Sequence, residues 1–65
     1  MSEILRDRYG TMIGQIRTEG SKRILLDRYG YMLGRYEAVL DMTFDKYGNM
    51  IARGDLLVTL LDRDT

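Results

Sequence analysis

Short apolar runs alternate along the chain with glycine-containing turns, and one motif accounts for most of the turns. The motif D-[RK]-Y-G-x-M-[IL]-[GA]-[QR] occurs three times, at residues 7–15, 27–35 and 45–53. Its Asp, Tyr, Gly and Met are identical in all three copies. An internal repeat of this length indicates one supersecondary unit that is used three times.

The turn chemistry of the motif predicts a β-hairpin. Asp favours the first position of a type I turn, because its side chain accepts hydrogen bonds from backbone N–H groups ahead of it. Gly three residues later suits the left-handed position of a three-residue hairpin loop. We therefore predict hairpin tips at residues 8–10, 28–30 and 46–48, with a positive φ at each tip glycine. The predicted structural turn residues are Asp7, Gly10, Asp27, Gly30, Asp45 and Gly48.

Three hairpin units, at about residues 3–18, 22–37 and 41–54, predict a single mainly-β domain built as an antiparallel meander. An apolar C-terminal segment follows at residues 55–62, and Asp55 is a plausible N-cap for it. This segment is either a short helix or a seventh strand, because periodicity cannot assign so short a run. The cap and the spacing of its leucines favour the helix.

The predicted tips also fix a strand register, and with it the two faces of the sheet. Uninterrupted pairing from the middle tip opposes Leu25 to Leu33, Ile24 to Gly34 and Arg23 to Arg35. The same register gives the pairs Leu5/Ile13, Ile4/Gly14, Leu26/Met32, Thr43/Ile51, Phe44/Met50 and Met42/Ala52. Both faces are then largely apolar, so a closed sheet, the C-terminal segment or neighbouring subunits must cover the second face.

Length and composition favour self-association. A 65-residue chain buries too little surface for a comfortable margin of stability, and this one has no Cys or His to supply a disulfide or a common zinc ligand. Ten basic residues balance ten acidic ones, which makes nucleic acid an unfavoured partner, and no apolar run approaches the length of a membrane span. We expect a cytoplasmic homo-oligomer without cofactor or metal. Its expected interface is Leu56, Leu57, Leu60 and Leu61.

Two groups of residues suggest ligand binding. Arg23 and Arg35, placed opposite each other, require a nearby negative charge, which Glu37, another subunit or a bound anion would supply. With Tyr31 and Tyr36, they form a candidate site for a small anion or nucleotide. The tip tyrosines are Tyr9, Tyr29 and Tyr47. They could stack on nucleobases, fold back across their own hairpins or pack against a neighbouring copy.

The segment Phe44-Asp45-Lys46-Tyr47-Gly48-Asn49-Met50-Ile51 resembles the tyrosine–aspartate (YD) repeat of Rhs-type proteins. The likeness weakens at Asp7 and Asp27, which lack the preceding aromatic residue. The chain as a whole is more similar to small bacterial or phage proteins with several D-x-x-G hairpins, and its near-identical repeats also fit an engineered chain. The resemblance implies hairpins and transfers no activity.

No set of residues supports catalysis, since the chain has no His or Cys and its two serines lie near a terminus and in a turn. The sequence therefore favours a non-enzymatic, self-associating β-hairpin-repeat module with a structural or interaction role. The alternative is a small-ligand binding protein with sites between subunits.

Overall fold

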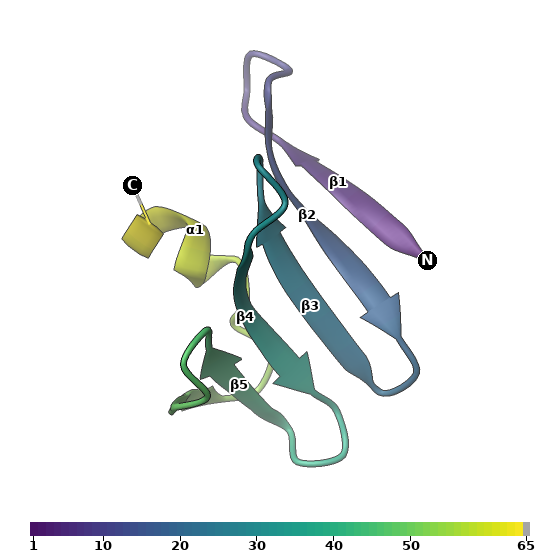
Figure 1. The fold of residues 1–65 in the computed structure, drawn as a ribbon, viewed down its shortest axis with the longest axis vertical. Coiled ribbons are helices and arrows are strands. Elements are labelled where there is room, and N and C mark those ends of the chain that lie inside the picture. Colours follow the sequence, from purple (N-terminus) through teal and green to yellow (C-terminus); the bar gives the residue numbers. More distant parts are fainter. Residues whose placement is uncertain (65) are drawn as a thin grey trace.

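Six strands that follow one another in sequence also lie side by side, forming one antiparallel meander in the computed structural model (Figure 1). They are β1 (Ser2–Arg6), β2 (Met12–Glu19), β3 (Lys22–Asp27), β4 (Met32–Glu37), β5 (Met42–Asp45) and β6 (Met50–Arg53), and helix α1 (Thr59–Asp64) follows them. The structure describes residues 1–64, with side chains as far as residue 61; the side chain of residue 62, within the predicted C-terminal segment, lies outside this range. The predicted mainly-β meander with a short helix is confirmed.

The three motif turns have the same geometry, and the aspartate organises each of them. In the middle copy, Asp27 Oδ1 accepts hydrogen bonds from the backbone N–H of Tyr29 at 2.8 Å and of Tyr31 at 2.9 Å. The first and third copies repeat both bonds at 2.8–3.0 Å. The tip glycines have φ values of 84°, 90° and 87°, as predicted. The turn roles of Asp7, Gly10, Asp27, Gly30, Asp45 and Gly48 are those that the sequence indicated.

Beyond each turn, the predicted register is wrong by one residue because every motif contains a β-bulge. Leu26 pairs with Met32 as predicted, but Leu25 pairs with Gly34, so that Leu33 is an extra residue in β4. Ile13 and Ile51 are the extra residues at the equivalent positions in β2 and β6. A bulge leaves one residue unpaired and re-aims the side chains that follow it. The small residues after the bulge therefore change faces; these are Gly14, Gly34 and Ala52.

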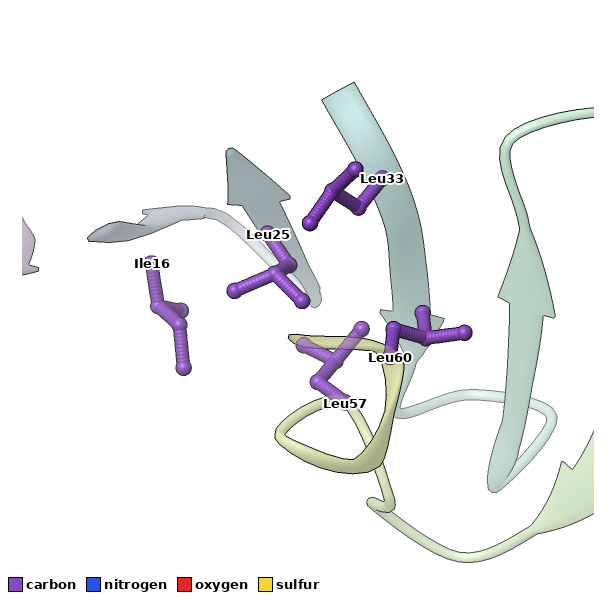
Figure 2. Packing of buried hydrophobic residues seen from close by; sticks show 5 residues of the cluster. All are labelled: Ile16, Leu25, Leu33, Leu57 and Leu60. Atoms are coloured by element: carbon purple, nitrogen blue, oxygen red, sulfur yellow. The ribbon is translucent and has the colours of Figure 1, made fainter. Parts of the chain in front are cut away.

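The core lies between one face of the sheet, here called the core face, and the C-terminal segment. Ile16, Leu25 and Leu33 point from β2, β3 and β4 toward Leu57 and Leu60 (Figure 2). Leu25 is fully buried and Leu57 is 1% exposed. Four partly buried residues complete the cluster: Leu5, Tyr36, Ile51 and Leu61. One short apolar segment thus covers this face of the meander.

Glycines on the core face allow the C-terminal segment to approach the strands. A Cβ atom at Gly34 would overlap the Leu60 side chain and lie 2.5 Å from the Phe44 carbonyl oxygen. At Gly14, a Cβ would lie 3.2 Å from Leu61 Cδ2. Both glycines reach this face only because of the bulges, so the bulge and the docked segment depend on each other.

A buried threonine fixes the start of the C-terminal segment. Thr43 is fully buried on β5, and its hydroxyl donates a hydrogen bond to the Gly54 carbonyl at 2.6 Å. The same oxygen accepts a hydrogen bond from the Leu56 backbone N–H at 3.1 Å. Nearby, the Asp55 side chain forms an ion pair with Arg23 and accepts a 3.4 Å hydrogen bond from the Leu57 backbone. These contacts aim the segment back across the sheet.

The expected oligomer interface is therefore corrected. Leu57 and Leu60 are buried by the chain's own sheet and Leu61 packs at the margin of the same cluster, which leaves Leu56 as the only one of the four that is substantially exposed, at 44%. The helix begins at Thr59 rather than directly after Asp55, because residues 57–58 form a turn with i to i+3 hydrogen bonds.

Replacing Asp27 by Ala should lower the free energy of unfolding by about 1 kcal/mol, because two turn N–H groups lose their acceptor. Asp27→Asn keeps the oxygen and is the matched control, with a smaller expected loss. Urea denaturation followed by circular dichroism measures both. Equal stability of the Ala variant and the parent would contradict the role given to this carboxylate.

Replacing Thr43 by Val should cost about 1 kcal/mol or more, because the nearly isosteric side chain leaves a part-buried carbonyl and a part-buried N–H without their partner. Thr43→Ser keeps the hydroxyl and should restore much of that loss. Hydrogen exchange of the Leu56 amide provides a local readout, and its exchange should accelerate in the Val variant. An unchanged rate would show that the hydroxyl does not hold the segment.

Candidate interaction surfaces

The two arginines of the predicted ligand site lie on opposite faces of the sheet. Arg23 pairs across the strands with Tyr36, and Ile24 pairs with Arg35, because the bulge in β4 shifts the register. Arg23 contacts Asp55 and lies 4.0 Å from Glu3. The residues therefore do not form the single anion site that the uninterrupted register predicted.

Arg35 forms an ion pair with Glu37, one of the acidic partners that the sequence indicated. Its Nε donates a 2.8 Å hydrogen bond to Glu37 Oε2, two residues along the same strand. Its guanidinium carbon lies 4.5 Å from the centre of the Phe44 ring on the neighbouring strand. The ion pair and the cation–π contact hold Arg35 flat against the sheet, where its side chain is 30% exposed.

The two tyrosines of the same predicted site are also separated. Tyr36 contacts the core and donates a 2.8 Å hydrogen bond to Asp41, which has a φ of 52° in the loop before β5. That hydrogen bond is the main cause of a raised Tyr36 pKa. Tyr31 is 72% exposed at the middle hairpin tip, at the other end of β4.

The second face of the sheet, here called the outer face, is open and largely apolar, with Arg6, Gln15, Arg17 and Arg35 among its apolar residues. The pairing brings eight apolar residues onto it: Ile4, Met12, Ile24, Leu26, Met32, Met42, Phe44 and Met50. None of them is buried, and Ile4, Met32 and Met50 are 45%, 38% and 52% exposed. Among the described residues, nothing packs over this face, because the C-terminal segment lies on the other one.

Methionine dominates the outer face for a reason that is visible in the repeat. The motif places Met12, Met32 and Met50 at the same position, immediately before the bulge, and Met42 lies on the same face. Every methionine after Met1 is thus on this surface. Met is flexible and polarisable, and it is common on surfaces that bind partners.

A row of charged residues borders the outer face at the end away from the hairpin tips. The cross-strand pairing aligns Glu19, Lys22, Glu37, Met42 and Arg53 from β2 to β6. Charges along this row alternate in sign, and its two ends are opposite in charge. The outer face therefore has an apolar area, which Gln15, Arg17 and Arg35 interrupt, and a charged rim.

The three tip tyrosines do not fold back across their hairpins. Tyr9, Tyr29 and Tyr47 are 78%, 78% and 79% exposed. The Arg8 guanidinium carbon lies 5.2 Å from the Tyr9 ring centre, and Lys46 Nζ lies 5.5 Å from that of Tyr47. Because the three motif turns join β1 to β2, β3 to β4 and β5 to β6, they lie at the same end of the antiparallel strands (Figure 1).

The chain matches no protein-family model, no curated protein and no solved structure. Across the described residues, no helix is long and apolar enough to cross a membrane. The same part of the chain contains no group of three or more Asp and Glu side chains that could hold a metal ion.

The sequence identified every apolar residue of the outer face except Met12, but it grouped them with the small residues that follow the bulges. The signal for the bulge was weak, because the motif has no glycine at the extra position itself. The move of Gly14, Gly34 and Ala52 onto the core face could not be predicted, because it depends on the C-terminal segment that packs there.

Replacing Asp41 by Asn should lower the pKa of Tyr36, since the acidic partner that raises it is then neutral. A raised folded-state pKa stabilises the fold below the ordinary tyrosine pKa, and this contribution is lost as the pH rises through the folded value. Ultraviolet titration of the tyrosines should show one high-pH component in the parent that is absent from Asp41→Asn and from Tyr36→Phe. Identical titration curves would contradict the Tyr36–Asp41 hydrogen bond.

Proposed function

We propose that this protein is a non-enzymatic β-hairpin-repeat module that self-associates through the outer face of its sheet. The observation that carries the proposal is the open, methionine-rich apolar surface on that face. Contiguous apolar surface of this kind is unusual on a monomer and is typical of an interaction site. The role is structural or one of interaction, and no catalytic chemistry is assigned to it.

An open antiparallel sheet face suits a second copy of the same sheet as its partner. A second copy of the same sheet supplies a matching apolar surface, and two sheets packed face to face are a common solution for antiparallel sheets.

The charged rim also supports a second copy as the partner. Glu19 lies at one end of the rim, on β2, and Arg53 lies at the other, on β6. A twofold axis parallel to the strands and centred on β4 reverses the row, which brings Glu19 of one copy over Arg53 of the other and Glu37 over Glu37 of the other copy. Glu37 is already paired with Arg35, so the Glu19–Arg53 contacts at the two ends favour this register.

The alternative, a small-anion or nucleotide site between subunits, has no observation in its favour. Arg23 and Arg35 are on opposite faces, and each already has an acidic partner in its own chain. The resemblance to hairpin-repeat proteins agrees with a module of this kind, and it adds no ligand.

Sedimentation equilibrium of the parent should show a homo-oligomer at micromolar concentration. The double variant Met32→Lys and Met50→Lys should be a folded monomer. Both side chains are partly exposed within one chain, so the lysines should not unfold it. Burying the two charges in an interface between copies would be unfavourable, so the variant should not associate. Circular dichroism should retain the parent strand signal. Val39→Lys, at an 81% exposed loop position off the outer face, is the matched control and should remain oligomeric.

A parent that sediments as a monomer would contradict the proposal. An oligomer that persists in the double methionine variant would show that association uses another surface. Leu57→Asp is a comparison variant for the core. It should unfold the chain rather than yield a folded monomer, because the Leu57 side chain lies in the core.

A further inference from the structure

We infer that the hairpin tips form a second interaction surface, separate from the outer face, that binds single-stranded nucleic acid. The surface consists of three exposed tyrosines and the basic residue before each of them: Arg8, Tyr9, Arg28, Tyr29, Lys46 and Tyr47.

The fold itself does not require a tyrosine at the tips. The turn is built by the aspartate carboxylate and the glycine with positive φ, whereas the tyrosine contributes only its backbone N–H. Its ring is nearly four-fifths exposed in every copy. Two of the rings have a cation–π contact with the basic residue before them, but all three residues remain exposed, so the aromatic residue repeated at this position indicates a partner outside the chain.

The repeat places the three tips at one end of the sheet. Successive motif turns are two strands apart, and neighbouring strands are separated by about 4.8 Å, so the tips recur about every 10 Å along one end of the sheet. A ligand that uses all three must be extended and must present flat groups repeatedly. A polynucleotide strand has both properties, since each of its bases has a stacking surface.

Each tip carries one carboxylate and one basic side chain, so what favours an anionic polymer is where these charges lie rather than their sum. Each motif aspartate is half-buried and directs its Oδ1 toward two backbone N–H groups of its own turn. These bonds lower the pKa of Asp45, and the largest cause is the Asn49 backbone. The basic side chains next to the tyrosines are exposed. Carboxylates thus face the loops while cations lie beside the rings, within reach of a phosphate.

The cation–π contacts fit the same role. Arg8 lies beside the Tyr9 ring and Lys46 beside the Tyr47 ring, so a cation is held next to a stacking surface before any ligand arrives. The middle tip adds Tyr31, which is 72% exposed. Aromatic rings that alternate with cations are the combination that binds single strands without sequence preference.

The test measures fluorescence anisotropy of a labelled oligothymidylate, about 20 nucleotides long, on titration with the full chain. We expect saturable binding at low salt, with log K falling against log salt at a slope of about −2 for three phosphate contacts. The triple variant Tyr9→Ala, Tyr29→Ala and Tyr47→Ala should weaken binding by at least about fivefold for each ring lost. The matching triple Phe variant keeps the rings and should bind like the parent.

Two controls separate the surface from the fold. The triple Ala variant should keep the parent's thermal midpoint, because the rings are exposed. Val39→Ala truncates an equally exposed side chain at the opposite end of the sheet and should bind like the parent. Absence of binding at low salt, an unchanged affinity in the triple Ala variant, or equal affinity for duplex DNA would each overturn the inference. So would binding to anionic lipid vesicles without binding to the oligonucleotide.

Discussion

The docking of the C-terminal segment on the core face is the interaction on which the rest of the structure depends. An open sheet one layer thick has two faces, and among the described residues the C-terminal segment covers only one of them. Leu57 and Leu60 complete a core that the strands begin with Ile16, Leu25 and Leu33. Without that segment the sheet would have no enclosed core, because a single layer cannot bury its own side chains.

Several features of the sheet make room for the C-terminal segment or bind it. The bulge in each motif moves a small residue onto the core face, and Gly34 there leaves room for Leu60 against the strand backbone. Thr43 and the Arg23–Asp55 ion pair set the direction in which the chain leaves β6. The methionine of each motif precedes the bulge and keeps its place on the outer face. One repeated local distortion therefore separates the small residues of the covered face from the methionines of the open one.

The sequence predicted what depends on local chemistry. The aspartate and the glycine of each motif determine the turn within five residues, so the tips, the strand order and the three hairpin units could be derived. The bulges could not, because pairing Leu25 with Gly34 rather than with Leu33 is decided by the core that both leucines join. The supposed Arg23–Arg35 site failed for the same reason: a shift of one residue places the two side chains on opposite faces. Leu57 was recognised as apolar, but whether its partner is its own sheet or a second chain depends on tertiary packing.

The central claim is that the C-terminal segment covers its own sheet and leaves the outer face for a second copy. The most direct measurement is an isotope-filtered NOESY spectrum of a mixture of ¹³C-labelled and unlabelled protein, which detects only contacts between chains. The account predicts interchain cross-peaks from Met32, Phe44 and Met50, while the contacts of Leu57 with Leu25 appear only in the unfiltered spectrum of the labelled chain. Interchain cross-peaks between Leu57 and Leu25 would contradict it, because the segment would then cover the sheet of a neighbouring subunit.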